Sequence, residues 1–296
     1  MIIYLIRWTN RPVHKFYREM LTSGVCENSP IKLHIMANGD VPMDELTAAY
    51  AKSHPGQVTF EMGTKPLPTF ISRAWQKTLN AGEQYFGLLD DDAKFTDAQF
   101  MYDRAMEAFS LDAGACGPII PSMLYFQHLG ETEEQTRMAV IRHPWFTSGV
   151  QIYDVERLAP LWKPMIKPMM AELKWRSDFQ VFMAASDLGC VPREFKCPGY
   201  KHATATGSSN GYGEGYWKSR VLTMAHDYEV TAKYVSKFID PEVYMKSVYR
   251  SLAGELRATL RRIREQDTSK WSVPICEDVN DFYAYIERNR ELLEAK

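Results

Sequence analysis

Residues 85–92 read YFGLLDDD, so a short apolar run ends directly on three aspartates. The run follows a segment of helical composition that closes on Gly82, and it predicts a buried strand. In open α/β sheets, ligands bind at the carboxyl ends of the strands. Asp90, Asp91 and Asp92 therefore mark the sheet edge at which a functional site is expected.

The residues before this strand alternate between strand and helix composition. Apolar runs at residues 2–6 and 31–36 end in loop-forming residues and predict buried parallel strands, with a third strand at 58–60. Helices are expected at residues 14–22, 44–53 and 67–82. Such alternation is typical of an α/β sheet whose faces are both covered by helices.

After the acidic triplet the expected elements are more varied. The sequence predicts helices at residues 97–110 and 177–188, strands at 113–120, 138–142 and 149–153, a surface loop at 130–136, and a loop or lid at 200–215. Asp154 is expected to cap a further helix at its amino end. From residue 216 onward the composition is mostly helical, and the length fits either one large domain or two units, residues 1–215 and a smaller appendage at residues 216–296.

The composition fits a protein with a sizeable core and no membrane anchor. The chain has 296 residues, 45% of them hydrophobic and 24% charged, and no apolar run is long enough to span a bilayer. Its five cysteines are odd in number and scattered, so neither a disulfide framework nor a zinc site is indicated, and a cytoplasmic location is expected. The net charge of -2 offers no overall attraction to a polyanion, which leaves a local basic face as the route to nucleic acid.

The acidic triplet itself constrains the chemistry. Three adjacent carboxylates repel one another, so burying them at a strand end is costly unless a cation compensates. Mg2+ and Mn2+ prefer oxygen ligands, bind few protein carboxylates and fill their other positions with water and substrate phosphates. A substrate with a pyrophosphate leaving group would suit such a site. The alternative is a solvated acidic turn before the helix that begins near Asp97.

The segment YFGLLDDDAKF at residues 85–95 resembles the apolar strand and DxD element of GT-A fold glycosyltransferases, and the preceding residues 70–84 extend the resemblance. It implies an α/β, Rossmann-like mixed sheet flanked by helices, with a helical C-terminal extension. It also implies transfer of a sugar from a nucleotide-sugar donor, a UDP-sugar being favoured, to a hydroxyl acceptor. Asp92 would bind Mn2+ or Mg2+ directly, Asp90 would contact the metal or the ribose, and Asp91 would have a secondary role. Residues 1–215 would then be the catalytic domain.

In that family the loops after the first two strands usually hold the nucleotide base and the ribose. The positions implied on this chain are Thr9, Asn10, Arg11 and Asp40. Arg73 and Lys77, on the helix before the acidic strand, are candidate contacts to the nucleotide or its phosphates.

Residues 175–178 read WRSD and lie where inverting GT-A enzymes carry an acidic residue at a helix start. The resemblance implies that Asp178 removes the proton of the acceptor hydroxyl as that oxygen attacks the anomeric carbon. The family usually has glutamate before this aspartate, whereas this chain has Ser177, a departure that leaves the stereochemistry of transfer open. An ordinary N-cap is the alternative role.

Two further segments enter through the resemblance. The loop WFTSGV at residues 145–150 resembles one that lines the donor sugar and the acceptor, with Trp145 as a flat apolar surface and Gly149 allowing close backbone approach. His202 stands where several GT-A families complete the metal shell with a histidine, which would favour Mn2+. The alternatives are a buried core tryptophan and an incidental histidine.

Residues 247–266 combine regularly spaced leucines with arginines. A packed amphipathic helix with a solvated basic side accounts for this pattern. The sharper alternative is a phosphate-binding surface for a nucleic-acid acceptor, because lysine and arginine contacts to phosphates dominate such affinity. Some cytoplasmic GT-A-like enzymes glycosylate hydroxymethylated bases in viral DNA, and this chain is compatible with that acceptor.

Two other function classes stay open. A nucleotidyltransferase also combines an α/β sheet with metal-binding carboxylates, but it would show a glycine-rich phosphate loop near the first strand, where this chain reads IRWTNRPVHK. A non-enzymatic carbohydrate- or nucleic-acid-binding module would use the acidic turn structurally. The sugar, the acceptor and the oligomeric state have no signature in the sequence.

Overall fold

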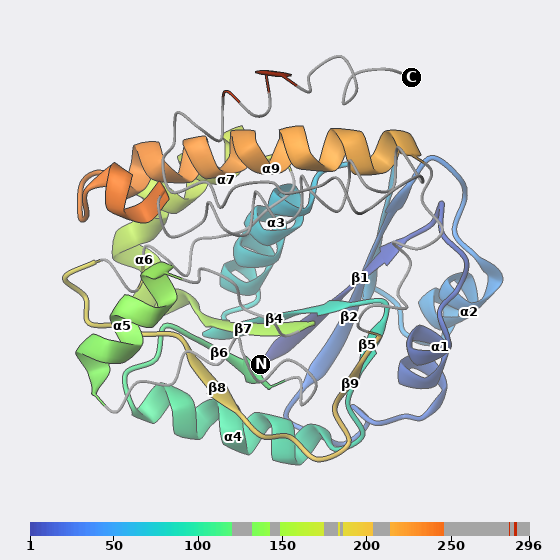
Figure 1. The fold of residues 1–296 in the computed structure, drawn as a ribbon. Coiled ribbons are helices and arrows are strands. Elements are labelled where there is room, and N and C mark those ends of the chain that lie inside the picture. Colours follow the sequence, from blue (N-terminus) through green and yellow to red (C-terminus); the bar gives the residue numbers. More distant parts are fainter. Residues whose placement is uncertain are drawn as a thin grey trace, which may run out of the picture.

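The computed structural model of the protein describes residues 1–119, 132–142, 149–174, 183, 186–203, 214–245, 284 and 287–288. Its centre is a seven-stranded sheet with the strand order β3-β2-β1-β4-β7-β6-β8 (Figure 1). The strands of this sheet are β1 (Ile2–Trp8), β2 (Lys32–Gly39), β3 (Val58–Met62), β4 (Tyr85–Asp90), β6 (Ala115–Pro118), β7 (Val150–Asp154) and β8 (Arg193–Phe195). A second, two-stranded sheet joins β5 (Ala93–Lys94) to β9 (Lys201–His202).

The large sheet is mixed. β1 pairs in parallel with β2 and β4, and β2 pairs in parallel with β3, because helices connect these strands and return the chain to the same edge. β7 is antiparallel to both β4 and β6. The expected mixed α/β sheet is therefore confirmed, as are its first four strands.

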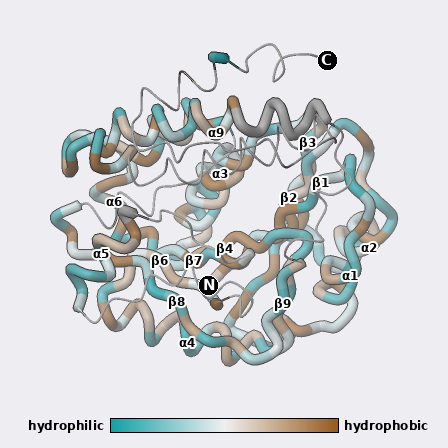
Figure 2. Tube along the Cα trace, viewed as in Figure 1, coloured by the Kyte–Doolittle hydropathy of each residue, from teal (hydrophilic) through white to brown (hydrophobic). Residues whose placement is uncertain are grey.

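Helices cover both faces of the sheet. They are α1 (Lys15–Thr22), α2 (Glu45–Ser53), α3 (Leu67–Asn80), α4 (Ala98–Ser110), α5 (Glu133–Arg142), α6 (Val155–Leu161), α7 (Lys167–Glu172) and α9 (Glu214–Val235), with a π-helical turn at Trp162–Ile166. α3, α6, α7 and α9 share one hydrophobic cluster with the sheet, whereas α1 and α4 share the other. In Figure 1, α3 and α9 lie above the sheet and α4 lies below it, and Figure 2 shows apolar colouring along β2 and β4 between these layers.

Strand β1 shows how the sequence fills both layers. Ile2, Tyr4 and Ile6 belong to the cluster that contains α3, and Ile3 and Leu5 belong to the cluster that contains α1 and α4. Because both faces of the strand are covered, its residues 2–6 form a continuous apolar run without polar alternation. Each such fully buried side chain stabilises the fold by about 1.5–3 kcal/mol.

The strand expected at residues 138–142 is wrong, because these residues form the second half of helix α5. Thr132 and Gln135 make a capping box at the start of this helix. The Gln135 N–H donates to Thr132 Oγ1 at 3.2 Å, and the Thr132 N–H donates to Gln135 Oε1 at 3.0 Å. Acidic residues in the first turn favour the helix further through its dipole. The helix also replaces the second half of the surface loop expected at 130–136.

Three other boundaries can be compared with expectation. Asp154 caps α6 as expected, because its carboxylate accepts hydrogen bonds from two N–H groups in the first turn. The strand expected at 113–120 is confined to β6. The loop expected at 200–215 is wrong at both ends, where the chain forms β9 and the first turn of α9.

The C-terminal part of the chain is described in pieces. The helix expected at residues 177–188 lies outside the described residues except for Met183 and residues 186–188, and the latter form a bend and a turn. The basic segment at 247–266 lies outside them as well. α9 confirms a helix after residue 216 and shares a core with α3 and α7, while the two-unit division at residue 215 stays a prediction. Of the helices that the structure describes, none is long and apolar enough to cross a membrane.

Candidate active site

The candidate site forms at the carboxyl end of β4, in the centre of the sheet. β4 ends on Asp90, the chain turns, and β5 follows at once. β5 pairs antiparallel with β9 in a register that sets Ala93 opposite His202, and the Ala203 N–H donates to the Asp92 carbonyl at 2.9 Å. This pairing brings His202 beside the acidic turn from a distant part of the sequence.

Asp90, Asp92 and His202 form one compact group of oxygen and nitrogen ligands. His202 Nε2 lies 3.3 Å from Asp92 Oδ1 and 3.9 Å from Asp90 Oδ2. One ligand atom from each residue lies within 4.8 Å of the other two, and no other such group of three occurs in the described part of the chain. Two carboxylates and an imidazole are a donor set that suits Mn2+.

The three residues shift one another's protonation. Loss of hydration in the turn and the charge of Asp92 raise the pKa of Asp90 to about 7, although 49% of its side chain is exposed. Burial opposes ionisation of Asp92 as well, but the hydrogen bond and the charge of His202 outweigh it and lower the pKa of Asp92. Burial opposes protonation of His202, yet the two aspartates raise its pKa above the ordinary value. The group therefore attracts a positive charge, for which a proton and a divalent cation would compete.

Gly149, which directly precedes β7, packs against the group of Asp90, Asp92 and His202. Its carbonyl accepts from the Asp90 N–H at 2.9 Å, and its N–H donates to the Tyr200 hydroxyl at 2.7 Å. A Cβ at this position would lie 2.5 Å from His202 Cδ2 and 2.8 Å from the Ala93 Cβ. Only glycine lets the imidazole of His202 pack this closely, and the expected approach of Gly149 to a donor sugar stays a prediction.

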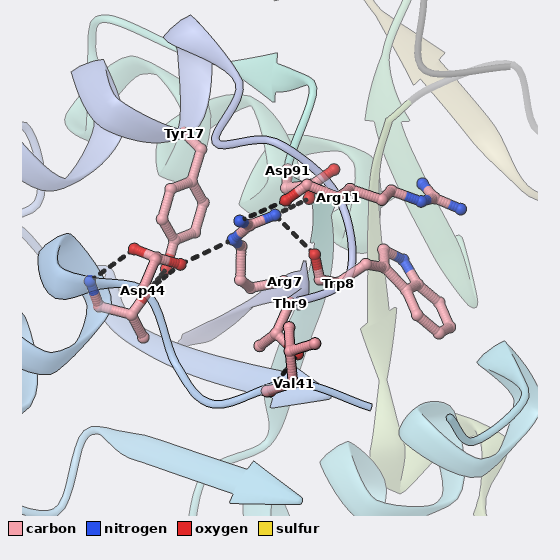
Figure 3. Close-up of polar contacts among 9 residues, drawn as sticks. Arg7, Trp8, Thr9, Arg11, Tyr17, Val41, Asp44 and Asp91 are labelled. Atoms are coloured by element: carbon pink, nitrogen blue, oxygen red, sulfur yellow. Dashed lines mark hydrogen bonds and ion pairs between the residues drawn. The ribbon is translucent and has the colours of Figure 1, made fainter. Parts of the chain in front are cut away.

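Asp91 points toward Arg7 of the first strand (Figure 3). Its carboxylate lies 3.2 Å from Arg7 Nη1, and 8% of its side chain is exposed. Arg7 Nε also donates to Asp44 Oδ2 at 3.0 Å, so one guanidinium bridges two carboxylates. Burial raises the pKa of Asp91, and the charges of Arg11 and Arg7 oppose that rise.

Arg7 and Asp44 are not among the residues that the sequence singled out. A signal for Arg7 was present, because it follows an apolar run in a strand expected to be buried, where a charge requires a partner. Asp44 is the first residue of the helix predicted at 44–53; the structure makes it the N-cap of α2, where its carboxylate accepts from the Thr47 N–H at 3.0 Å. Their meeting depends on the alignment of β1 with β2, which no local pattern gives.

The loop after β1 lies next to the acidic turn, but its residues differ in their contacts. The charge of Arg11 favours the ionised form of all three aspartates, and its Cζ lies 5.3 Å from the centre of the Trp8 ring. Thr9 is buried, and its hydroxyl donates to the Val41 carbonyl at 2.8 Å. Asn10 is exposed. Of the four positions expected to hold base and ribose, Arg11 is thus brought to the acidic turn.

The remaining expected donor contacts lie over neighbouring strands. Asp40, after β2, accepts hydrogen bonds from the N–H and the hydroxyl of Thr64 at 3.1 and 2.9 Å. On α3, Arg73 forms an ion pair with Glu61 of β3. The charge of Lys77, also on α3, lowers the pKa of His34 on β2. The structure therefore places these three residues around β2 and β3, two to three strands away from β4, the strand that carries the acidic turn.

Trp145 and Asp178 lie outside the described residues, as do residues 204–213 of the expected lid. Their roles stay predictions. Lys174, the last described residue before Asp178 in its segment, is held in place, because its N–H donates to the buried Asp227 carboxylate of α9 at 2.9 Å.

Neither a protein-family model nor a curated protein matches this chain. Solved structures with a similar chain path include the mannosyltransferase PcManGT from Pyrobaculum calidifontis in complex with GDP-Man and Mn2+, at a TM-score of 0.48 and 13% identity over 99% of this chain and 81% of that one. S. aureus TarS 1-349 in complex with UDP-GlcNAc gives 0.45 and 13% over 100% and 93%. Glucosyl-3-phosphoglycerate synthase from Mycobacterium tuberculosis, in complex with Mn2+, UDP and glucosyl-3-phosphoglycerate, gives 0.45 and 10% over 80% and 79%. Values this low carry no argument about chemistry, which rests on the residues of this chain.

Proposed function

We propose that this chain is a metal-dependent glycosyltransferase that moves a sugar from a nucleoside diphosphate sugar to a hydroxyl acceptor. The observation that carries the proposal is the group of Asp90, Asp92 and His202 at the carboxyl end of β4, where ligands of open α/β sheets bind. Two carboxylates facing one imidazole suit a divalent cation that also binds a diphosphate. The resemblance of residues 85–95 to the DxD element supports the same conclusion.

The residues present fit a divalent metal. Asp90 and Asp92 would each hold it through a carboxylate oxygen, and His202 through Nε2, the ring nitrogen that faces both aspartates. An imidazole in the ligand set favours Mn2+ over Mg2+. When bound, the metal would neutralise charge on the diphosphate leaving group.

Arg11 is proposed to contact a phosphate of the donor. It lies beside the acidic turn, where its charge acts on all three aspartates. A guanidinium matches the geometry of phosphate oxygens and stays ionised at every physiological pH. A UDP-sugar is the proposed donor, on the strength of the family resemblance.

The acceptor side of the proposal rests on the sequence. Asp178 would serve as the general base, which makes the reaction inverting. Asp178→Asn should leave donor binding intact and lower turnover by roughly 10²- to 10⁴-fold. Loss of donor binding in that variant would assign Asp178 a structural role instead.

DNA with hydroxymethylated bases is the proposed acceptor class, supported by the arginine-rich segment at residues 247–266. Transfer of a labelled sugar to such DNA, compared with unmodified DNA of the same sequence, tests this step. Equal absence of label on both would remove DNA from the proposal and leave the donor site as it stands.

The decisive experiment is a thermal-unfolding panel of nucleotides and nucleotide sugars, with and without Mn2+, because a ligand that binds only the native state raises the Tm by mass action. We expect a Mn2+-dependent rise with one nucleoside diphosphate and its sugar, and loss of that rise in Asp92→Ala. Asp103→Ala, at an exposed aspartate of α4, is the matched control. Absence of any shift in the unmodified protein would favour a non-enzymatic binding module.

A further inference from the structure

Arg7 is a buried cation in the core of the protein, and its side chain is 1% exposed. A charge this deep is tolerated when its donors are satisfied and its charge is balanced. Arg7 Nε and Nη1 pair with the carboxylates of Asp44 and Asp91. Nη1 also donates to the Trp8 carbonyl at 2.7 Å, and Nη2 donates to the Arg11 carbonyl at 2.8 Å.

These contacts join three separate segments of the chain. The two carbonyls belong to the end of β1 and the loop that follows it, Asp44 begins α2 after the loop that follows β2, and Asp91 is in the acidic turn after β4 (Figure 3). The first and third of these segments carry residues of the proposed donor site, namely Arg11 and the aspartates of the acidic turn. The guanidinium is therefore a common anchor for the loops at this edge of the sheet.

We infer that Arg7 is a positioning residue, which holds the acidic turn in register with the loop after β1 so that the metal ligands and Arg11 can engage one donor diphosphate. The inference rests on the proposed function. Arg7 acts through Asp91, because Asp90 and Asp92 flank that residue and a displacement of Asp91 moves both. It has no contact with the metal ligands themselves among the described contacts.

The geometry requires arginine and not merely a positive charge. A planar guanidinium presents its donors as a fixed fork, whereas a lysine ammonium is a point charge with three donors. Arg7 also packs on Tyr17, with Cζ 5.3 Å from the ring centre. The Tyr17 hydroxyl lies 2.7 Å from Thr47 Oγ1, which donates to Asp44 Oδ2 at 2.9 Å, so the anchor is itself held in place.

The first test compares Arg7→Lys with the unmodified protein by titrating Mn2+ and following free Mn2+ by electron paramagnetic resonance. We expect the Kd for Mn2+ to rise roughly 10- to 100-fold, which is the usual cost of losing a residue that orients metal ligands. Arg104→Lys, in the ion pair with Glu107 on α4, is the control and should leave the Kd unchanged. A folded Arg7→Lys protein with an unchanged Kd overturns the inference.

The second test does not require any change at Arg7, whose variants risk unfolding. Asp91→Asn and Asp91→Ala both remove the same negative charge, but only asparagine keeps an oxygen that can accept from Arg7 Nη1. If the tie to Arg7 positions the turn, Asp91→Ala should bind Mn2+ at least about tenfold more weakly than Asp91→Asn. Equal affinities would show that Asp91 matters only through its charge and would overturn the inference.

The outcomes separate this inference from the proposed function. Unmodified protein that binds Mn2+ and a nucleoside diphosphate, together with variants of equal affinity, leaves the function standing and removes the role of Arg7. Unmodified protein that binds neither Mn2+ nor any nucleotide refutes the function and the inference together. Binding of Mn2+ without any nucleotide, with weakened Mn2+ binding in Arg7→Lys, keeps the anchor and refutes the transferase.

Discussion

The acidic turn after β4 has two sides whose electrostatics differ. On the metal side, Asp90 and Asp92 face the imidazole of His202, whose Nε2 is 3.3 Å from Asp92. On the arginine side, Asp91 of the turn and Asp44 at the start of α2 both contact the guanidinium of Arg7. Adjacent aspartates of one turn therefore have different partners: Asp92 contacts the titratable imidazole of His202, and Asp91 contacts the permanently charged guanidinium of Arg7.

The difference decides which side is available to a ligand. A guanidinium does not release its proton in a protein, so the arginine side keeps its compensation at all pH values of interest. An imidazole titrates near neutrality, so the metal side can exchange a proton for a metal ion. We therefore expect changes on the metal side to alter ion binding with little effect on stability, and changes on the arginine side to alter stability first.

Asp92→Ala should show the largest effect. Loss of a metal ligand is expected to lower donor turnover by roughly 10³-fold, since a catalytic metal supplies several kcal/mol of charge stabilisation. The free energy of unfolding should change by less than about 1 kcal/mol, because the substitution removes the contact with His202 but also relieves the repulsion from the neighbouring aspartates, and these two effects oppose each other. Release of nucleoside diphosphate from the donor measures the first quantity, and urea unfolding the second. Turnover within tenfold of normal would break the comparison at its metal side.

Asp44→Ala should show the opposite profile. The substitution removes the N-cap of α2 and one of the two carboxylates that compensate Arg7, so we expect a loss of about 2–4 kcal/mol in the free energy of unfolding. Asp97→Ala removes a cap of the same kind from α4, where the carboxylate accepts from the Phe100 N–H and is exposed. It should cost about 1 kcal/mol. The excess at Asp44 measures the Arg7 contact, and equal losses would show that the contact stabilises nothing.

Gly149→Ala should weaken the metal side through packing alone. The new methyl group would contact the imidazole of His202 and displace it, so the Kd for Mn2+ should rise roughly 10- to 100-fold. Gly114→Ala is the control, because its Cβ would clash with Met183 and Cys190, which are not part of the site. Both variants should lose about 1–3 kcal/mol of stability from overpacking, and only the first should lose metal affinity. Parallel losses of affinity in the two would point to general destabilisation.

The two sides of the turn were not equally predictable from the sequence. The abrupt change from apolar residues to aspartates locates the end of β4. Because ligands of open α/β sheets bind at the carboxyl ends of strands, this change also predicts the position of the site. His202 entered through the family resemblance and not through any local pattern. What brings it to Asp92 is the pairing of two strands of two residues each, Ala93–Lys94 and Lys201–His202, and a strand that short has no periodicity to detect.

The arginine side and helix α5 show the other limits. The position of Arg7 after an apolar run indicates that its charge requires a partner, but its partners Asp44 and Asp91 come from distant segments that no local pattern identifies. Residues 138–142 contain valine and isoleucine, which favour a strand, but the capping box at Thr132 fixes the helix before that run begins. A start signal that lies upstream therefore overrides the local preference.

The smallest effect sharpens the comparison by separating the pH dependence of the metal side from that of the rest of the sheet. Burial and the charge of Lys77 lower the pKa of His34 on β2 from 6.5 to about 4. As the pH falls below 6.5, the unfolded chain takes up a proton that the folded chain refuses, so stability present above that pH is lost toward pH 4. Between pH 7 and pH 5, the free energy of unfolding of His34→Gln should fall by about 1–2 kcal/mol less than that of the unmodified protein. Urea unfolding at each pH measures this difference.

Asp90 works in the opposite sense, which makes the two contributions distinguishable. Its pKa is raised on folding to about 7, so the folded chain binds the extra proton and the contribution of this group is lost as the pH rises toward 7. In the absence of metal, Asp90→Asn should therefore flatten the fall in stability with rising pH, whereas His34→Gln should flatten the fall with decreasing pH. Saturating Mn2+ should cancel the first effect and leave the second, because the ion takes the place of the proton only at the metal side. If Mn2+ changed both slopes alike, the ion would be binding elsewhere and the contrast between the two sides of the turn would be lost.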